Sequence, residues 1–491
     1  IAFAIGILAT GNSLYLLILP ACAVLYYCKK YTFTRIGIII VIVVSFVITA
    51  LIIGYIIPGI SYMLFLSELL FVNKFSLPQH FGVFIICFVV LALIIIGLYY
   101  SHIRAKYLLN TAILSFLLFC LAYSSLTVFV IRSQANPPVD YKNPEHAYSL
   151  FRYITDSQHT NKPLWFGQSY ASPVVEVQES TPLYTFEQNR YVTNNCIHKP
   201  IYARETQTLF PRVWSSEPLH VQEYVKWAQI EPEKNTNAYY INGITYHIPT
   251  FLHHLKFFIS YQCNYMYVRY LMWNFVGQQN DIIGNGEPHK GNWISGIPFF
   301  DSLRLGPQDS LPDVLQNNKA RNTYFFIPFI LAIAGFILVI MYHKRYAIVI
   351  TLVFVCGGGL LAWYFNYTPL QARERDYEFV LSFYAFSMCI GVGVVSLYVL
   401  LYQYFSKHIL YISIAISGLC PVLLYAQNYD DCNKSGRLFA HDFSKNLLTT
   451  CKPNSLLFSD SDNDTYPLWY MQQVEKYRTD VRGITVSLLS T

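Results

Sequence analysis

Residues 36–57 read IGIIIVIVVSFVITALIIGYII and contain no charged side chain. A helix of about 20 apolar residues spans the hydrocarbon core of a bilayer, so this stretch predicts a transmembrane helix. Pro58 and Gly59 follow it, and we expect them to end the helix. This run places the chain among membrane proteins.

Similar apolar runs recur towards both ends of the chain. A short run at 14–27 either joins residues 1–10 or follows an earlier span, and clear runs lie at 82–100, 107–131, 324–342, 346–365, 379–405 and 409–426. The sequence therefore predicts an α-helical polytopic membrane protein with eight or nine spans. Because the chain begins at Ile1 and not at a methionine, we expect an internal piece of a longer protein, without its signal peptide.

The composition supports the same class of protein. Of 491 residues, 54% are hydrophobic and only 13% are charged. A soluble protein of this size needs more charge to cover its surface, and a disordered chain needs far fewer apolar residues. The formal net charge of +6 is small and spread along the chain, so it gives no support to a nucleic-acid partner.

Short loops between the runs indicate the direction of the chain through the membrane. Every second loop is basic and contains no acid: 28–35, 101–106, 343–345 and 406–408. By the positive-inside rule these loops lie on the cytoplasmic side. The alternate loops are then predicted to lie on the outer face: 58–81, 132–323, 366–378 and 427–491.

The spans divide the chain into four predicted parts. These are a first transmembrane bundle at 1–131, an outer-face loop domain at 132–323, a second bundle at 324–426, and the start of a truncated α/β domain at 427–491. In the last part, helix signals at 438–450 and 467–477 alternate with strand signals at 455–459 and 483–489, which predicts a parallel α/β unit. Cys432 and Cys451 lie there, and their spacing alone does not decide whether they form a disulfide.

The loop at 366–378 reads NYTPLQARERDYE and places five charges directly before a span, at Arg373, Glu374, Arg375, Asp376 and Glu378. Dense mixed charge at a membrane boundary usually faces protein or an aqueous cavity. Arginine pairs bind phosphate oxygens, so one interpretation is a site for the phosphate of a lipid-linked donor with an acid beside it. The other is an arginine–carboxylate network that fixes the loop to a soluble domain. From the residues alone the two are weighed evenly.

A second cluster, at 261–281 and 291–298, is rich in aromatic residues. It predicts an amphipathic helix on the outer membrane surface, and interfacial anchoring is the favoured explanation of its aromatics. Because sugars stack on aromatic faces, the cluster is also a candidate substrate groove. Its candidate residues are Arg269, Trp273, Asn274, Asp281 and Trp293, and the polar side chains at 269, 274, 278 and 281 are expected to project from the helix.

Two further acidic features have a functional and a simpler interpretation. Asp462 and Asp464 form an Asp-x-Asp motif that some nucleotide-sugar transferases use to hold a divalent ion, but capping of a helix beginning near Pro467 is favoured. The EF-hand pattern fails, because its sixth and twelfth positions are occupied by Thr465 and Met471. Glu68 is a lone acid in the 58–81 loop, and a solvated residue is favoured over a base.

Together the clusters at 261–281 with 291–296, 366–377 and 462–491 resemble a bacterial family of large multispanning membrane proteins, long filed as a domain of unknown function and common in Bacteroidetes. That family is related to the animal transmembrane protein O-mannosyltransferase and belongs with the GT-C glycosyltransferases. The resemblance extends from the region of residue 55 to the end of the chain and is weakest over 132–250.

The resemblance implies a GT-C-like fold. It also implies transfer of a sugar, with mannose as the first candidate, from a polyprenyl-phosphate donor to Ser or Thr of a secreted or envelope protein. It implies reaction on the outer, periplasmic face of the bacterial inner membrane. Arg373 and Arg375 would contact the donor phosphate. GT-C enzymes place their key acid in the first outer loop, so we expect that acid upstream of Ile1; Asp376, Glu374 and Glu68 are the weak candidates within this chain.

No cofactor other than the lipid-linked donor is implied, and a metal at Asp462 and Asp464 is not favoured. Two other classes of function stay open at this point. A transporter or flippase of lipid-linked substrates would need charged or broken helices in mid-membrane, and the spans contain almost no ionisable residues. A non-catalytic assembly subunit of the envelope would use the outer domains as docking surfaces.

Overall fold

The computed structural model describes residues 1–491 except 12, 141, 156–161, 242, 309, 403–408, 487, 488, 490 and 491. The predicted basic loop at 406–408 therefore lies outside the described residues. The chain divides into two compact units. Unit 1 consists of Ile1–Leu126 and His146–Asn428, and unit 2 consists of Thr127–Glu145 and Tyr429–Thr491.

Within the described part of the chain, seven helical stretches are long and apolar enough to cross a membrane. They are Ser13–Lys30, Arg35–Lys74, Phe81–Ile103, Tyr107–Gln134, Lys344–Phe365, Asp376–Tyr402 and Leu410–Cys432. An eighth apolar helix, α14 (Ile327–Tyr342), has 16 residues. Each of the eight predicted apolar runs thus coincides with a helix, which is the structure that satisfies every backbone hydrogen bond within a bilayer.

Residues 1–10 do not extend the run at 14–27. They form a separate helix, α1 (Ala2–Thr10), and a 3₁₀ turn η1 (Ser13–Ile18) leads into α2 (Leu19–Lys30). Nine residues rise only about 14 Å, about half of the hydrocarbon thickness. At Gly6 the backbone of α1 packs closely against Phe119 on α6 (Tyr107–Tyr123).

The expectation that Pro58 and Gly59 end the apolar helix at 36–57 is wrong. Helix α3 (Arg35–Leu51) continues through a π-helical turn η2 (Ile52–Ile56) into α4 (Ile57–Leu69) and a second π-helical turn η3 (Leu70–Lys74). Pro58 lies in the first turn of α4, and the wide turn η2 directly before it accommodates the missing N–H. The predicted outer loop at 58–81 is therefore mostly helix.

Glycine pairs bring membrane helices into backbone contact in unit 1. A side chain on Gly335 of α14 would collide with the backbone of Cys389 and Gly393 on α17 (Val380–Tyr402). A side chain on Gly393 would in turn collide with Leu331 of α14. Since lipid provides no hydrophobic force between helices, such close packing is a main source of their association. Helix α15 (Lys344–Gly357) approaches α17 in the same way at Gly357.

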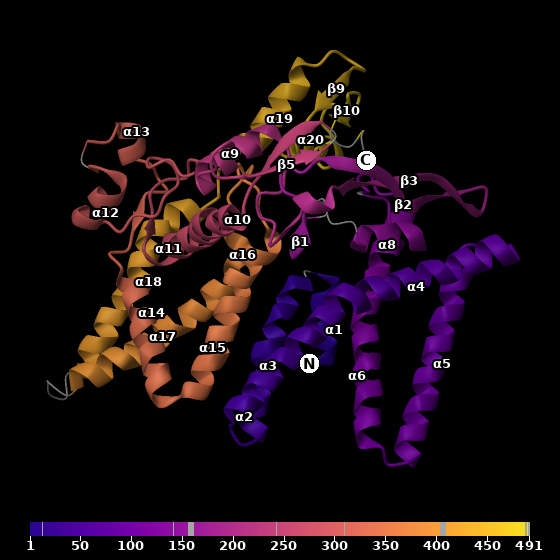
Figure 1. The fold of residues 1–491 in the computed structure, drawn as a ribbon, viewed down its shortest axis with the longest axis horizontal. Helices are drawn as coiled ribbons and strands as arrows, with labels where there is room; N and C mark the ends of the chain where they lie inside the picture. Colours follow the sequence, from indigo (N-terminus) through magenta and orange to yellow (C-terminus); the bar gives the residue numbers. More distant parts are fainter. Residues whose placement is uncertain are drawn as a thin grey trace. The chain divides into compact units, whose positions relative to one another are not determined.

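The turns at the ends of these helices fall into two groups. The described basic turns lie between α2 and α3, between α5 (Phe81–Ile103) and α6, and between α14 and α15, and all three lie at the same end of the helices, the lower end in Figure 1. The short sheets of unit 1 and helices α8–α13 lie towards the other end. The three turns that the sequence places on one side of the membrane thus share one end of unit 1.

The stretch between the two groups of apolar helices is built from two-stranded antiparallel sheets and short helices. The sheets are β1 (Phe166–Gly167) with β4 (Thr208–Leu209), β2 (Val174–Glu187) with β3 (Arg190–Tyr202), β5 (Asn237–Ile241) with β6 (Ile244–Ile248), and β7 (Gly277–Gln278) with β8 (Asn322–Thr323). The helices are α8 (Ala147–Thr155), α9 (Pro218–Ala228), α10 (Phe251–Phe257), α11 (Arg269–Phe275), α12 (Pro298–Leu305) and α13 (Asp313–Gln316).

Most aromatic side chains of the stretch 261–281 pack against protein. The stretch runs as α10, the π-helical segment η6 (Phe258–Val268) and α11, and its aromatic side chains form the largest hydrophobic core of the described chain. Tyr261, Tyr265, Tyr270 and Trp273 are all buried there. Packing within the protein therefore accounts for these four rings, while Leu252, Ile259 and Val268 on the same helical segment are exposed.

Unit 2 contains the predicted parallel α/β arrangement. Helix α19 (Phe439–Thr450) precedes β9 (Leu456–Ser459), α20 (Asp462–Gln473) and β10 (Arg482–Thr485), and β9 and β10 pair in parallel. Helix α20 begins at Asp462 and not near Pro467, because Ser461 occupies the N-cap position and two carboxylates in the first turn favour the positive end of the helix. Both cysteines of this region, Cys432 and Cys451, are free thiols.

Candidate functional site

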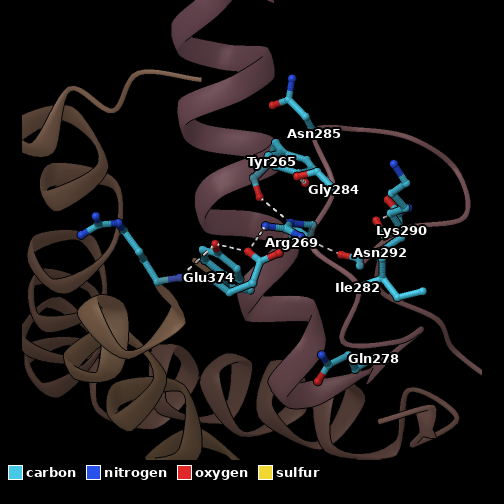
Figure 2. Close-up of polar contacts among 12 residues, drawn as sticks. Tyr265, Arg269, Gln278, Ile282, Gly284, Asn285, Lys290, Asn292 and Glu374 are labelled. Carbon is cyan, nitrogen blue, oxygen red and sulfur yellow. Dashed lines mark hydrogen bonds and ion pairs between the residues drawn. The ribbon is translucent and has the colours of Figure 1, made fainter. Parts of the chain in front are cut away.

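A buried ion pair fixes the charged loop at 366–378 to the aromatic helix. Arg269 Nη2 lies 2.7 Å from Glu374 Oε2, and Arg269 Nη1 donates to Glu374 Oε1 at 3.2 Å. Two further donors of the guanidinium go to backbone oxygens, Nε to Tyr265 O at 2.9 Å and Nη1 to Gly291 O at 2.7 Å. Figure 2 shows Arg269 enclosed in this way. Its guanidinium is therefore occupied by protein, and the expectation that it projects towards a substrate is wrong.

Aromatic rings complete the surroundings of this pair. The guanidinium carbon of Arg269 lies 3.9 Å from the ring centre of Tyr265, 4.6 Å from that of Tyr270 and 4.7 Å from that of Trp273. Burial alone would lower the pKa of Arg269, but the hydrogen bonds to Glu374 raise it overall. The hydrogen bonds between the two side chains offset the loss of hydration in this water-poor site.

Tyr270 links the ion pair to Arg375. Its hydroxyl donates to Glu374 Oε2 at 2.5 Å and accepts from the backbone N–H of Arg375 at 3.1 Å. Arg375 Nη1 also donates to Glu378 Oε1 at 3.2 Å, and Nε of Arg375 has no hydrogen-bond partner in the described structure. The loop is thus held rigidly up to Arg375, while part of the Arg375 side chain is left for a ligand.

The start of the same loop is fixed by a buried amide. Asn366 is fully buried; its Nδ2 donates to Pro163 O at 2.8 Å and to Pro211 O at 3.0 Å. Its Oδ1 accepts from Gln262 Nε2 at 3.0 Å. The backbone of Asn366 is left-handed, a conformation that Asn adopts more readily than most residues. Residues 366–375 therefore form an ordered wall and not a free loop.

This wall borders a cavity of about 1070 Å³ that lies wholly within unit 1. From the loop it is lined by Tyr367, Thr368, Gln371 and Arg375, and Lys162 lies beside them. The opposite lining comes from β1, from residues 197–202 of β3, and from residues 214–217 with His220 at the N-terminus of α9. These elements lie at the end of unit 1 away from the basic turns (Figure 1).

The cavity carries an excess of positive charge next to the loop. Lys162 Nζ lies 5.6 Å from the ring centre of Tyr367, and the guanidinium of Arg375 lies 5.8 Å from the same ring. Burial and the nearby Arg375 lower the pKa of Lys162 to about 8, while Glu378 opposes the shift. His198, Lys199 and His220 add basic groups to the lining, and Glu217 adds one acid. Such a site favours an anion, and its aromatic ring offers an apolar face beside it.

A serine, a histidine and a carboxylate also meet at the N-terminus of α9. Ser215 Oγ lies 2.9 Å from His220 Nδ1, and Glu217 Oε2 lies 3.2 Å from the same nitrogen. In a hydrolytic triad the nucleophile and the carboxylate bind opposite ring nitrogens. This arrangement therefore orients His220 in the cavity wall and does not form a triad.

Of the sequence candidates, Arg375 lines the cavity, and Glu374 is bound within the ion pair behind it. Arg373 is exposed, with its guanidinium 5.8 Å from the ring centre of Tyr377. Asp376 is half-buried in the turn η7 (Asp376–Phe379).

Glu68 is fully buried, contrary to the expectation of a solvated residue. Its carboxylate accepts from the backbone N–H groups of His80 and Val83 at the start of α5. It therefore satisfies backbone donors that the first turn of a helix leaves unpaired. A side chain on Gly82 would collide with the backbone of Glu68, which shows how closely the two helices approach.

The proposed substrate groove is dispersed. Trp273 is buried beside Arg269, while Asn274 is exposed and donates to Tyr270 O at 2.8 Å. Asp281 is exposed and accepts from Asn318, and Trp293 packs against Arg304. None of these four is among the described residues that line the cavity.

Asp462 and Asp464 belong to unit 2, where Asp464 accepts from Ser461 Oγ at 3.1 Å. Three or more His, Cys, Asp or Glu side chains that could hold a metal ion do not gather anywhere in the described part of the chain. The two carboxylates lie in the first turn of α20 and do not occupy its N-cap position, which belongs to Ser461, so the capping prediction holds only in that they lie at the positive end of the helix.

Sequence reasoning missed Lys162, His198, Lys199 and His220. Each stands in a stretch without a motif. The only local signal for any of them is that Lys162 lies next to the apolar stretch 163–167, and a single basic residue beside such a stretch is a weak sign of a binding site.

Two parts of the chain match known families. Residues 440–491 match a family described as TMEM260-associated domain 2. Residues 160–259 match a family of unknown function, DUF8416. The second match contains Lys162, β3 and the start of α9, and so most of the cavity wall opposite the charged loop. No curated protein and no solved structure matches the chain.

Proposed function

We propose that this chain is part of a membrane glycosyltransferase. It moves a sugar, with mannose as the first candidate, from a polyprenyl-phosphate donor to Ser or Thr hydroxyls of proteins. The observation that carries the proposal is the cavity in which Lys162 and Arg375 flank the ring of Tyr367, beside the helical stretch Asp376–Tyr402 that is apolar enough to span a membrane. A donor with a phosphate head and a polyprenyl tail needs a cationic pocket at such a place.

The chemistry that the cavity would support is displacement at the anomeric carbon. The bond from that carbon to the phosphate oxygen breaks, and a bond to the acceptor hydroxyl oxygen forms. Negative charge grows on the leaving polyprenyl phosphate, and Lys162 and Arg375 would stabilise it. The hydroxyl proton passes to a general base, which in the GT-C family is an acid of the first outer loop.

The acceptor would lie along β3. Six consecutive residues of this strand, 197–202, line the cavity, so the edge of the strand and not one of its faces is turned to it. Among the described strands, β3 pairs with β2 alone. An extended polypeptide can bind such an edge through its backbone, whatever its sequence, and this suits an enzyme that modifies hydroxyls on several proteins.

The match of residues 440–491 to a TMEM260-associated domain supports the same proposal, since it agrees with the resemblance to transmembrane O-mannosyltransferases. The cavity is also the reason for preferring a transferase to an assembly subunit. A loop that served only to fix the soluble part would need the ion pair of Arg269 and Glu374 but not an adjoining cationic pocket.

Binding of tritiated polyprenyl-phosphate mannose to the chain in phosphatidylcholine nanodiscs tests the proposal. We expect Arg375→Ala and Lys162→Ala each to weaken binding at least tenfold, because each removes a charge-assisted contact. Lys226→Ala is the matched control, since Lys226 is exposed on α9 and lies outside the cavity lining. Unchanged binding in both cavity variants, with the control behaving as wild type, would refute the assignment.

A further inference from the structure

A second cavity, of about 570 Å³, lies at the end of unit 1 that carries the basic turns. One side is formed by the end of α2 and the turn after it, through Leu25, Cys28, Lys29 and Phe33. The other side is formed by residues 341–346 and Val349, where α14 turns into α15. Two basic turns that are some 300 residues apart in the sequence are thus brought to one site.

The turns are joined by a specific contact. Arg345 Nη1 donates to the backbone oxygen of Cys28 at 3.3 Å, and the guanidinium lies 5.3 Å from the ring centre of Phe33. A guanidinium at the last carbonyls of α2 also suits the negative end of that helix. The cavity is therefore a fixed feature of the packing of α2 against α15.

The charge of this cavity is of one sign. Lys29, Lys344 and Arg345 line it together with His343, and the described lining residues include no Asp or Glu. Lys29 and Lys344 are exposed and therefore accessible to a ligand. Three cations without a counter-charge repel one another, and an anion bound among them relieves that repulsion.

The rest of the lining is apolar or aromatic: Leu25, Phe33, Met341, Tyr342, Tyr346 and Val349. The cavity also lies at the ends of two stretches that are apolar enough to span a membrane, Ser13–Lys30 and Lys344–Phe365. In a bilayer crossed by these two stretches, the cations of the cavity would lie at headgroup depth and its apolar wall would continue towards the hydrocarbon. A small soluble anion would use only the first of these features.

We propose that this cavity binds the phosphate head group of an anionic phospholipid, with Lys29, Lys344 and Arg345 around the phosphate and the acyl chains along α2 and α15. Basic pockets between transmembrane helices on the cytoplasmic side are suited to such lipids. The site is separate from the cavity beside Arg375 and does not depend on the function proposed for it.

The test is a titration of the purified chain with fluorescent phosphatidylglycerol in neutral detergent, with phosphatidylcholine carrying the same label in parallel. The main variant is Lys29→Ala with Lys344→Ala, because both lysines are exposed and their loss leaves the Arg345–Cys28 contact in place. The control is Arg104→Ala with Lys106→Ala, which removes the same charge from a basic turn outside the cavity.

We expect wild type and control to bind phosphatidylglycerol in preference to phosphatidylcholine. We expect the Lys29/Lys344 variant to bind it roughly 30-fold more weakly, about 2 kcal/mol at about 1 kcal/mol for each cation. Equal losses in variant and control would overturn the proposal, because they would mean a general charge effect. Equal binding of both lipids, or full competition by inorganic phosphate at the same concentration, would overturn it as well. Gel filtration and circular dichroism confirm that each variant is folded.

Discussion

Arg269 and Glu374 are separated by 105 positions in the chain and are joined by two charge-assisted hydrogen bonds in the core of unit 1. The side chain of Arg269 is only 4% exposed and that of Glu374 is 22% exposed. This pair connects the aromatic helix to the loop that bears Arg375. It therefore links the stability of the fold to the placement of a cavity residue.

Removing one partner of this pair should be strongly destabilising. For Glu374→Gln or Arg269→Met we expect a loss of about 3–5 kcal/mol in the free energy of unfolding. The first variant leaves the guanidinium of Arg269 buried without its counter-charge, and the second leaves the carboxylate of Glu374 without its counter-charge. Denaturant unfolding in detergent, followed by tryptophan fluorescence, measures it.

The surface pair of Lys234 and Glu231 is the matched control. Its nitrogen and oxygen are 2.9 Å apart, but the side chains are 81% and 59% exposed. Glu231→Gln should change the free energy of unfolding by less than about 1 kcal/mol. Similar losses for the buried and the exposed pair would show that burial does not set the strength of the Arg269–Glu374 contact.

Tyr270→Phe should displace Arg375 without emptying the core. The variant keeps the buried ring but loses the hydroxyl between Glu374 and the N–H of Arg375, at a cost of about 1–3 kcal/mol in stability. We also expect weaker binding of polyprenyl-phosphate mannose, because the backbone of the loop is no longer fixed at Arg375.

The comparison is Tyr265→Phe, which removes a hydroxyl bonded to Gly284 O, away from Arg375. It should lower stability by a similar amount and leave donor binding as in wild type. Equal donor binding in Tyr270→Phe and Tyr265→Phe would contradict the positioning role of Tyr270.

Binding of an anion in the first cavity should depend on pH through Lys162. The folded-state pKa of Lys162 is lowered to about 8, below the ordinary lysine value, chiefly by burial. Below that pH the ammonium is charged and attracts the anion, and above it the amine becomes neutral. Affinity for polyprenyl-phosphate mannose should therefore fall as pH rises from about 8 to 10.

Lys162→Arg separates this effect from a general loss of the fold at high pH. An arginine stays charged throughout this range, so the variant should bind the donor with little change between pH 8 and 10. A decline that is the same in wild type and variant would assign the pH dependence to another group. The free energy of unfolding, measured over the same pH range, is the second readout. Because the pKa of Lys162 is lower in the folded state than in the unfolded state, this free energy should increase as pH rises from about 8 to about 10.

Helix packing predicts unequal effects for two glycines of α17. Gly393→Ala places a methyl group against the backbone of Leu331 and should cost about 1–3 kcal/mol in stability through overpacking. Gly391→Ala is two residues away and meets open space, so it should be neutral or slightly stabilising. Thermal unfolding in the same detergent compares them, and equal melting temperatures would contradict the close approach of α14 and α17.

The sequence by itself determined the features that depend on local composition. A run of apolar residues must be a helix wherever it meets hydrocarbon, because no other local structure pairs its backbone groups, so the spans could be predicted one at a time. The parallel pair β9 and β10 followed from alternating strand and helix signals within about 30 residues.

Only the tertiary structure decided which of the charged residues share a cavity. Lys162 Nζ donates to Phe365 O over a separation of 203 positions, and His198, Lys199 and His220 join them from elements with no motif. Nor could local signals show that Arg269 and Glu68 are buried and hydrogen-bonded within the protein. Whether a charge binds a ligand or a neighbour depends on which distant groups pack around it, and that is a property of the assembled fold.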